Sequence, residues 1–177
     1  MVTRKSTNIW VLFGILIIAA SLLGSATQAG AQTYTVKCRE TGHVPKMHII
    51  EVADVPGHIL LVGETATVLS CDDGSVATIS GKFTADMTKG SGKNQGYGLV
   101  TYEDGSTKWY KFQNTITPDP NGKTASWEGT MEYIKGTGRF EGIQGSGSIT
   151  GKRLVSMPGA GAQFYADFAI TYTLPSK

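Results

Sequence analysis

Beyond its N-terminal segment, the chain lacks an excess of charge of either sign. The full sequence carries 16 Lys and Arg against 14 Asp and Glu, but Arg4 and Lys5 lie in the first 31 residues, where no acidic residue occurs. Setting these two aside leaves 14 charged residues of each sign in residues 32–177. No basic stripe and no interleaving of basic with aromatic residues remains, so a nucleic-acid partner is not expected.

Long hydrophobic runs are also absent, with one exception near the N-terminus. The apolar run from Ile9 to Leu23 follows two basic residues, is short for a membrane span, and is followed by the small-residue pattern AGA at 29–31. We therefore predict a signal peptide over residues 1–31 and a secreted or periplasmic domain over 32–177, with no stable membrane insertion after cleavage. An uncleaved N-terminal anchor is the alternative. A lipoprotein anchor is not expected, because no cysteine directly follows the cleavage pattern.

Helical periodicity is missing from residues 32–177. Apolar and polar residues alternate instead, and turn residues separate the segments, which is typical of an all-β chain. The pattern predicts eight or nine strands, enough for a closed barrel. The candidate strands are Tyr34 to Arg39, Met47 to Ala53, Ile59 to Leu69, Val76 to Thr84, Gly96 to Tyr102, Thr107 to Ile116, Thr124 to Ile134, Ser146 to Val155 and Gln163 to Leu174.

Turn residues indicate where some of these strands are joined. Asp104-Gly105 is a strong signal for a two-residue hairpin. The segment Thr88 to Gln95, TKGSGKNQ, is predicted to be a mobile polar loop. A further break is expected at Pro118, Pro120, Asn121 and Gly122.

Cysteine is scarce, with only Cys38 and Cys71. An even pair in a chain addressed to an oxidising compartment favours one disulfide. A metal site is the competing interpretation, since His43, His48 and His58 all fall between the cysteines. Their spacings match no standard zinc pattern, so no metal is predicted.

Glycine, by contrast, is abundant between Gly136 and Gly151, in the sequence GTGRFEGIQGSGSITG. Glycine at such density permits positive φ angles or the close approach of two backbone segments. A dinucleotide-binding loop would need a preceding parallel strand, a following helix and a distal acid, and none is visible. No motif requires a nucleotide, haem, flavin or other cofactor, and no G-x-S-x-G elbow occurs. The turn motif consists of Gly136, Gly138, Phe140, Gly142 and Gly145.

This stretch resembles the allene oxide cyclase barrels and, more loosely, the dirigent proteins, which carry a G-x-G-x-F type of turn near the end of their barrel. The resemblance runs from about Trp127 to Pro158 and into the closing strand FYADFAITYTL. It implies a single antiparallel eight-stranded barrel. A fainter similarity covers His48 to Gly57, HIIEVADVPG, and implies that Glu51 is the functional carboxylate. The chain departs from the cyclases at Ala53, where they have an asparagine that helps to hold a water.

Alternation on two strands indicates which residues face the barrel interior. Phe164, Phe168 and Tyr172 share one face of the last strand with Ala166 and Ile170. Aromatic residues in such a row either fill a packed core or line a ligand pocket, and both arrangements give the same pattern. The candidate ligand-lining residues are Trp127, Met131, Tyr133, Phe164, Phe168 and Tyr172.

These observations predict a non-catalytic binding or structural module with a small hydrophobic ligand as its partner. The first alternative is an isomerase or cyclase that acts on an unsaturated, lipid-derived substrate with Glu51 as its acid, base or electrostatic stabiliser. Burial of that carboxylate would raise its pKa and make it useful near neutral pH. Alternation alone leaves a solvent-facing Glu51 as the simpler interpretation. The second alternative, implied by the dirigent resemblance, is a stereochemical guide, and an oligomer is possible.

Overall fold

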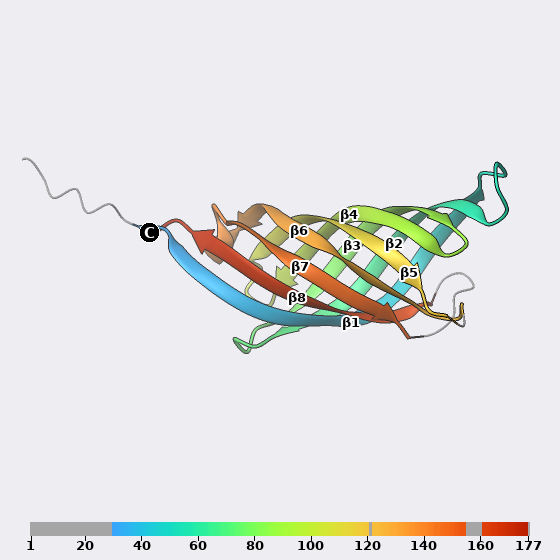
Figure 1. The fold of residues 1–177 in the computed structure, drawn as a ribbon. Helices are drawn as coiled ribbons and strands as arrows, with labels where there is room; N and C mark the ends of the chain where they lie inside the picture. Colours follow the sequence, from blue (N-terminus) through green and yellow to red (C-terminus); the bar gives the residue numbers. More distant parts are fainter. Residues whose placement is uncertain (1–29, 121, 155–160, 177) are drawn as a thin grey trace, which may run out of the picture.

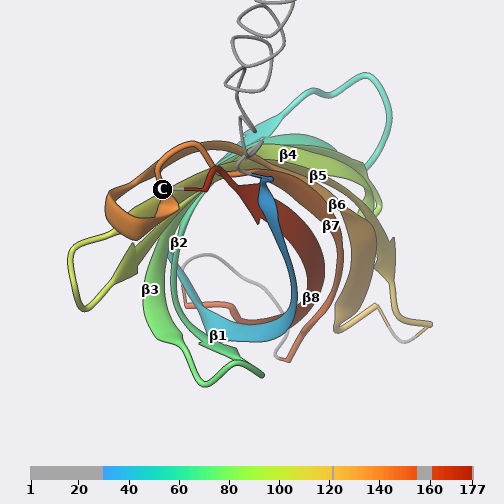
Figure 2. The same ribbon diagram turned by 90° about the vertical axis from the view of Figure 1, so that its left-hand side faces the viewer.

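The computed structural model describes residues 30–120, 122–154 and 161–176. They form one closed barrel in which eight antiparallel strands follow each other in sequence order (Figures 1 and 2). The all-β fold class and the eight-stranded barrel are confirmed. The strands are β1 (Gln32–Glu51), β2 (His58–Cys71), β3 (Val76–Thr88), β4 (Ser91–Tyr102), β5 (Thr107–Pro118), β6 (Ala125–Thr137), β7 (Gln144–Arg153) and β8 (Gln163–Leu174), and one short 3-10 helix, η1 (Gly138–Phe140), follows β6.

Some sequence predictions fall on residues outside the described part of the chain. These are the signal segment up to residue 29, Asn121 in the predicted break, Val155 at the end of a predicted strand and Pro158 at the end of the family resemblance. The barrel itself begins at Gln32. No helix in the described ranges is long and apolar enough to cross a bilayer.

Strand β1 closes the barrel, because it pairs with β2 along one edge and with β8 along the other. It spans 20 residues and unites two segments that the sequence predicts as separate strands. The pairing with β2 shifts register between His43 and Lys46. Pro45 lies in this interval and cannot donate a backbone hydrogen bond, which makes a local irregularity the natural solution. The sequence interruption is therefore a bulge in one strand, and Ala53 lies beyond its end.

The predicted mobile loop from Thr88 to Gln95 is wrong. Residues from Ser91 onward belong to β4 and pair with β3, from Thr88↔Ser91 to Thr84↔Gln95. Only Lys89 and Gly90 connect the strands, and both have positive φ angles, 51° and 81°. This is the backbone that a tight two-residue hairpin requires. The polar composition reflects a solvent-facing hairpin.

The hairpin at Asp104-Gly105 is confirmed, but its connection is longer than two residues. The Gly105 N–H donates to the Tyr102 carbonyl at 3.0 Å, and the Tyr102 N–H donates to the Ser106 carbonyl at 3.0 Å. Gly105 has φ 79°, so a turn is followed by a bulge. The Ser106 N–H donates to the Asp104 carboxylate at 3.0 Å, which fixes this longer form. The predicted break after Pro118 lies where β5 ends.

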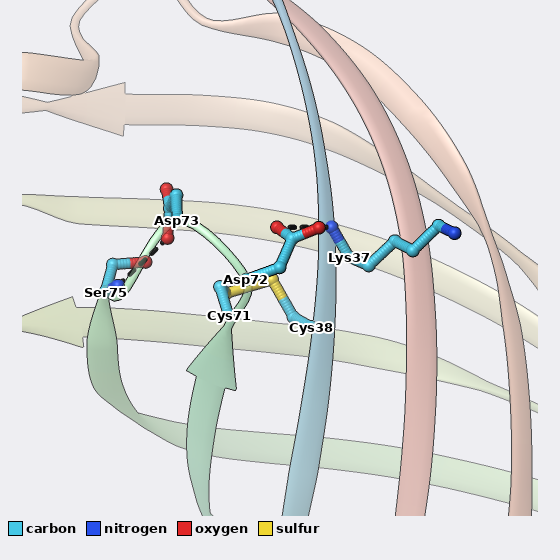
Figure 3. Close-up of a disulfide and its surroundings, with 6 residues drawn as sticks. All are labelled: Lys37, Cys38, Cys71, Asp72, Asp73 and Ser75. Atoms are coloured by element: carbon cyan, nitrogen blue, oxygen red, sulfur yellow. Dashed lines mark hydrogen bonds between the residues drawn. A yellow bond between two sulfur atoms is a disulfide. The ribbon is translucent and has the colours of Figure 1, made fainter.

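The disulfide between Cys38 and Cys71 is confirmed (Figure 3). The two cysteines are directly opposite each other in the β1–β2 pairing. Beside them, the Lys37 N–H donates to the Asp72 carboxylate at 3.0 Å and the Asp72 N–H donates to the Lys37 carbonyl at 2.9 Å. The disulfide and these two hydrogen bonds hold the β2–β3 turn against β1, near the end of the barrel where β1 begins.

The core lies inside the barrel, where alternate residues of every strand meet. On β8, the predicted inward row is confirmed, since Phe164, Ala166, Phe168, Ile170 and Tyr172 are all buried. Glycines on neighbouring strands make room for the largest rings. A Cβ on Gly98 would lie 2.2 Å from the Tyr110 ring, and one on Gly151 would lie 2.3 Å from the Trp127 ring. The glycine-rich sequence of β7 is thus part of the packing of the interior.

The glycine turn motif positions Phe140 at one end of the barrel. Gly138 and Gly142 have φ angles of 63° and 76°, which an L side chain rarely adopts. Between them, Phe140 is buried and packs on Tyr102 with ring centroids 4.9 Å apart. The motif therefore turns the chain and places the Phe140 ring in the interior.

Candidate functional site

The inward row of β5 shows how the interior changes from one barrel end to the other. Two polar residues, Lys108 and Asn114, are buried in this row and are separated by aromatic side chains. The Tyr110 and Phe112 rings between them have centroids 6.2 Å apart. The row reads Lys108, Tyr110, Phe112, Asn114 and Ile116. The described interior therefore has a polar group toward each end and rings in the middle.

A buried carboxyl group, that of Glu40 on β1, lies on the Asn114 side of these rings. Only 9% of Glu40 is exposed, and it lies opposite Leu69 of β2 and Ala166 of β8. The Thr67 hydroxyl donates a hydrogen bond of 3.3 Å to the Glu40 Oε2 atom. Burial raises the pKa of Glu40 to about 7, and the hydrogen bond from Thr67 opposes this only in part. Near neutral pH the carboxyl group therefore exchanges between its neutral and charged forms.

Glu40 borders a cavity of about 130 Å³, which we call the Glu40 cavity. An apolar protein cavity of roughly 150 Å³ can hold benzene, so this space has the scale of one ring. It is smaller than the several hundred Å³ of ordinary ligand sites. Trp127 and Phe164 meet edge to face at 5.8 Å and form one wall. Other lining residues include Met47, Leu61, Phe83, Phe168, Asn94, Asn114 and Arg153.

Three of the side chains that line this cavity carry buried atoms without a hydrogen-bond partner in the protein. These atoms are Oδ1 of Asn94, Oδ1 of Asn114 and Nε of Arg153. Asn94 and Asn114 are directly opposite each other in the β4–β5 pairing. Burial also lowers the pKa of the Arg153 guanidinium, while Asp119 raises it. Buried polar groups are nearly always hydrogen-bonded, and an unmade bond costs roughly 1–3 kcal/mol. The cavity thus presents apolar walls together with unused hydrogen-bonding capacity.

Glu51, the carboxylate predicted from the family resemblance, does not line the Glu40 cavity. It is the last residue of β1 and is exposed. Its partner on β2 is Ile59, and Ile49 pairs with the buried Leu61, so Glu51 shares the strand face with Ile49 as the alternation predicts. Because β1 ends at Glu51, this side chain lies at the rim of the barrel and is exposed. A catalytic role for Glu51 inside the barrel is therefore not supported.

The sequence reasoning missed Glu40, although a signal for it exists. The first predicted strand, Tyr34 to Arg39, stops one residue before Glu40, whereas β1 continues to Glu51. Val36 and Cys38 alternate as inward residues, and one more step of two reaches Glu40. A charged residue at that position is easily interpreted as the end of the strand, so Glu40 is not recognised as an inward residue.

The other predicted lining residues lie at different levels of the barrel. Trp127, Phe164 and Phe168 line the Glu40 cavity. Met131 and Tyr133 are buried in the packed core, and Tyr172 borders a second pocket at the opposite end. The structure therefore brings together three of the six predicted residues.

The histidines show no metal-binding arrangement. His58 contacts the Asp54 carboxylate through Nδ1 at 2.5 Å and the Asp86 carboxylate through Nε2 at 2.9 Å. Both hydrogen bonds raise the pKa of His58, and the one with Asp54 has the larger effect. Elsewhere His43 and His48 are exposed. Within the described ranges, no three side chains of the metal-ligating types gather.

Comparison with known proteins yields fold neighbours only. No family model and no curated protein matches the chain. The pterocarpan synthase dirigent protein GePTS1 superposes with a TM-score of 0.50 at 15% identity, covering 98% of this chain and 99% of its own. The pterocarpan synthase dirigent protein PsPTS1 also gives 0.50 at 15% identity, with 82% and 97% covered. A DUF3224-family protein of unknown function from Shewanella oneidensis gives 0.44 at 18% identity, with 80% and 96% covered.

The architecture places this chain among the eight-stranded antiparallel barrels. Its barrel superposes on those of two dirigent proteins, which confirms the dirigent-like part of the sequence resemblance at the level of the fold. At this level of identity the likeness concerns the fold alone.

Proposed function

We propose that this protein is an exported, non-catalytic binding protein that holds a small ring compound in the Glu40 cavity. The observation that carries the proposal is the convergence of Glu40 and three unpartnered polar atoms on one cavity with aromatic walls. A purely structural barrel gains nothing from leaving such atoms without partners inside its core. A ligand that supplies the missing hydrogen bonds would recover their cost.

The chemistry of the lining defines the ligand class. The walls favour an apolar ring, and about 130 Å³ admits one ring with a small substituent. That substituent would accept a hydrogen bond from Arg153 Nε and donate one to an asparagine Oδ1. A hydroxyl group does both. We therefore expect a phenol-like ligand in preference to a fully apolar ring.

Export is a second part of the proposal. The disulfide fits an oxidising compartment, and the sequence predicts a signal over residues 1–31. We propose a secreted or periplasmic location on these grounds. Assembly into an oligomer stays a prediction.

The test compares phenol with benzene as ligands for the purified, oxidised protein by NMR titration. We expect both to shift resonances around the cavity and phenol to bind about fivefold more tightly, since one net hydrogen bond contributes roughly 1 kcal/mol. In Asn114→Leu the preference should fall to near unity. Gln113→Leu, on the outer face of the same strand, should keep it. Absence of cavity shifts with either ligand would contradict the proposal.

A second candidate function, an isomerase, is favoured by one observation, the pKa of about 7 for Glu40. A carboxyl group with that pKa can both remove and return a proton near neutral pH. Glu40 would then take the part that the family resemblance assigned to Glu51. Two of the fold neighbours are pterocarpan synthase dirigent proteins by name, so a guiding role for a reactive ligand belongs to the same candidate.

A ring-sized probe tests this candidate directly. In 3-cyclohexenone, Glu40 as carboxylate would remove a proton from C2 and return one to C4, which moves the double bond into conjugation. Conversion to 2-cyclohexenone is followed by ultraviolet absorbance. We expect a rate that rises with pH through about 7, following the Glu40 carboxylate, and that is lost in Glu40→Gln but kept in Glu51→Gln. A rate that Glu40→Gln leaves unchanged would rule out the isomerase.

A further inference from the structure

A second ionisable group, Lys108, is buried at the other end of the barrel. It lies on β5 with 3% of its surface exposed. Four aromatic rings surround its Nζ atom, and no ion pair in the described part of the chain includes it. The distances from Nζ to the ring centroids are 5.0 Å for Tyr102, 5.2 Å for Tyr133, 4.6 Å for Phe140 and 5.4 Å for Tyr172.

This environment makes Lys108 unlike an ordinary lysine. Burial lowers its pKa to about 8; Asp73, in the β2–β3 turn, opposes the shift, and Arg139, in η1, adds to it. About a tenth of the Lys108 side chains are then neutral amines at pH 7, against fewer than one in a thousand for a lysine with the usual pKa near 10.4. Lys111, three residues along the same strand, shows the contrast. It pairs with Glu132 at 2.9 Å, which raises its pKa.

Lys108 also borders open space. A pocket of about 340 Å³ lies at this barrel end, where β1 begins and β8 ends (Figure 1). Its walls include Tyr34 and Tyr172, whose rings stack at 5.0 Å, and Phe140 from the glycine turn motif. We call it the Lys108 pocket. It is large enough for a single-ring compound, and its walls offer ring faces for stacking.

We propose that Lys108 is a carbonyl-binding amine, which forms an imine with a small aromatic aldehyde in the Lys108 pocket. The nitrogen lone pair attacks the carbonyl carbon and the C–O π bond breaks, which gives a carbinolamine after a proton moves from nitrogen to oxygen. The nitrogen then expels hydroxide, which leaves as water with the second amine proton, and a C=N bond forms. No oxidant or reductant takes part. A desolvated lysine is the kind that performs this chemistry, because its neutral amine is the nucleophile.

The test traps the imine in the oxidised protein. Benzaldehyde and cyanoborohydride are added at pH 7, and the cyanoborohydride reduces the imine to a stable secondary amine. Peptide mapping by mass spectrometry then locates the labelled lysine. We expect Lys108 to be labelled at least tenfold faster than Lys111, with a rate that rises through a midpoint near pH 8. Lys108→Met should lose the fast label, and Lys111→Met, changed on the outer face of the same strand, should keep it.

Two results would overturn the inference. One is labelling spread evenly over exposed lysines in the unmodified protein, and the other is a fast label that survives in Lys108→Met. If Lys108→Met does not fold, the peptide map and the pH dependence of labelling in the unmodified protein are sufficient to test the inference. The inference does not depend on the Glu40 cavity, since Asn114→Leu should leave the labelling of Lys108 unchanged.

Discussion

Each end of this barrel buries one ionisable side chain, and the two side chains have different surroundings. At one end a carboxyl group is buried, and at the other an amine is buried; burial moves the pKa of Glu40 up to about 7 and that of Lys108 down to about 8. Desolvation favours the neutral form in both cases. The surroundings differ, however. Lys108 is enclosed by ring faces, whereas Glu40 lines a cavity that also holds polar atoms without partners.

This difference indicates what each end can do. Ring faces support a cation without offering hydrogen bonds to a ligand, so the Lys108 pocket is suited to stacking and to the reactivity of the amine. Unpartnered amide and guanidinium atoms offer hydrogen bonds, so the Glu40 cavity is suited to recognition of a polar substituent. Aromatic side chains in the middle of the barrel, among them Tyr110 and Phe168, keep the two ends apart.

The largest effect is expected from removing one of these rings. Phe168 is 5% exposed and meets Tyr110 edge to face at 6.2 Å. Phe168→Ala should lower the free energy of unfolding by about 3–5 kcal/mol, because it deletes a buried ring and leaves a cavity. Urea denaturation measures this loss. Phe168→Leu, which leaves a smaller cavity, should lose less than half as much, and equal losses in the two variants would contradict this explanation.

Removing the disulfide should weaken the barrel as a whole without altering ligand selection at the Glu40 cavity. The bridge joins residues 33 apart in sequence. The double variant Cys38→Ala, Cys71→Ala should lower the free energy of unfolding by roughly 3–4 kcal/mol, the loop-closure value for that length. Phenol binding, measured well below the denaturation midpoint, should stay within a factor of two. A selective loss of binding would show that the two ends are coupled.

The buried carboxyl group should make stability depend on pH. The folded pKa of Glu40 is about 7, above its ordinary value of 4.5. Its stabilising contribution is therefore complete below pH 4.5 and is lost as pH rises through 7. The expected loss is about 3 kcal/mol, from 1.36 kcal/mol per pKa unit. Glu40→Gln should remove this dependence in denaturation series from pH 4 to 8, and a variant that keeps the full slope would refute the assignment.

The buried amine should give the opposite slope at higher pH. The folded pKa of Lys108 is about 8, below its ordinary value of 10.5. Its contribution to stability is present above pH 10.5 and is lost as pH falls through 8, a difference of about 3 kcal/mol. Lys108→Met should abolish that difference, measured relative to the unmodified chain between pH 7.5 and 10.5. Lys111→Met is the control and should leave it in place.

Much of the fold could be predicted from the sequence because its signals are local. Period-two alternation and turn residues indicated the strands, and the two cysteines indicated their bridge. The errors occurred where a local signal has two physical meanings. Pro45 can end a strand or sit in a bulge, and Lys89-Gly90 can belong to a loop or to a tight hairpin. Pairing with a distant strand decides between them, and a single sequence does not show it.

The candidate site was harder to predict for the same reason. Trp127, Phe164 and Phe168 were identified by alternation, but Glu40 has the charge of a surface residue. Its burial depends on pairing with both neighbouring strands, where Leu69 and Ala166 lie opposite it. Lys108 was missed likewise, since the rings around it come from β4, β6, β8 and η1. Ring closure of the sheet creates both environments.

Direct titration of Glu40 tests the central claim most simply. The protein is labelled with ¹³C at its glutamate carboxyl carbons, and Glu40→Gln assigns the resonance. The account predicts a carboxyl resonance that titrates with a pKa of about 7 while Glu40 stays in the folded barrel. A value near 4.5, the ordinary one for glutamate, would show that this carboxyl group is solvated and would contradict the buried site.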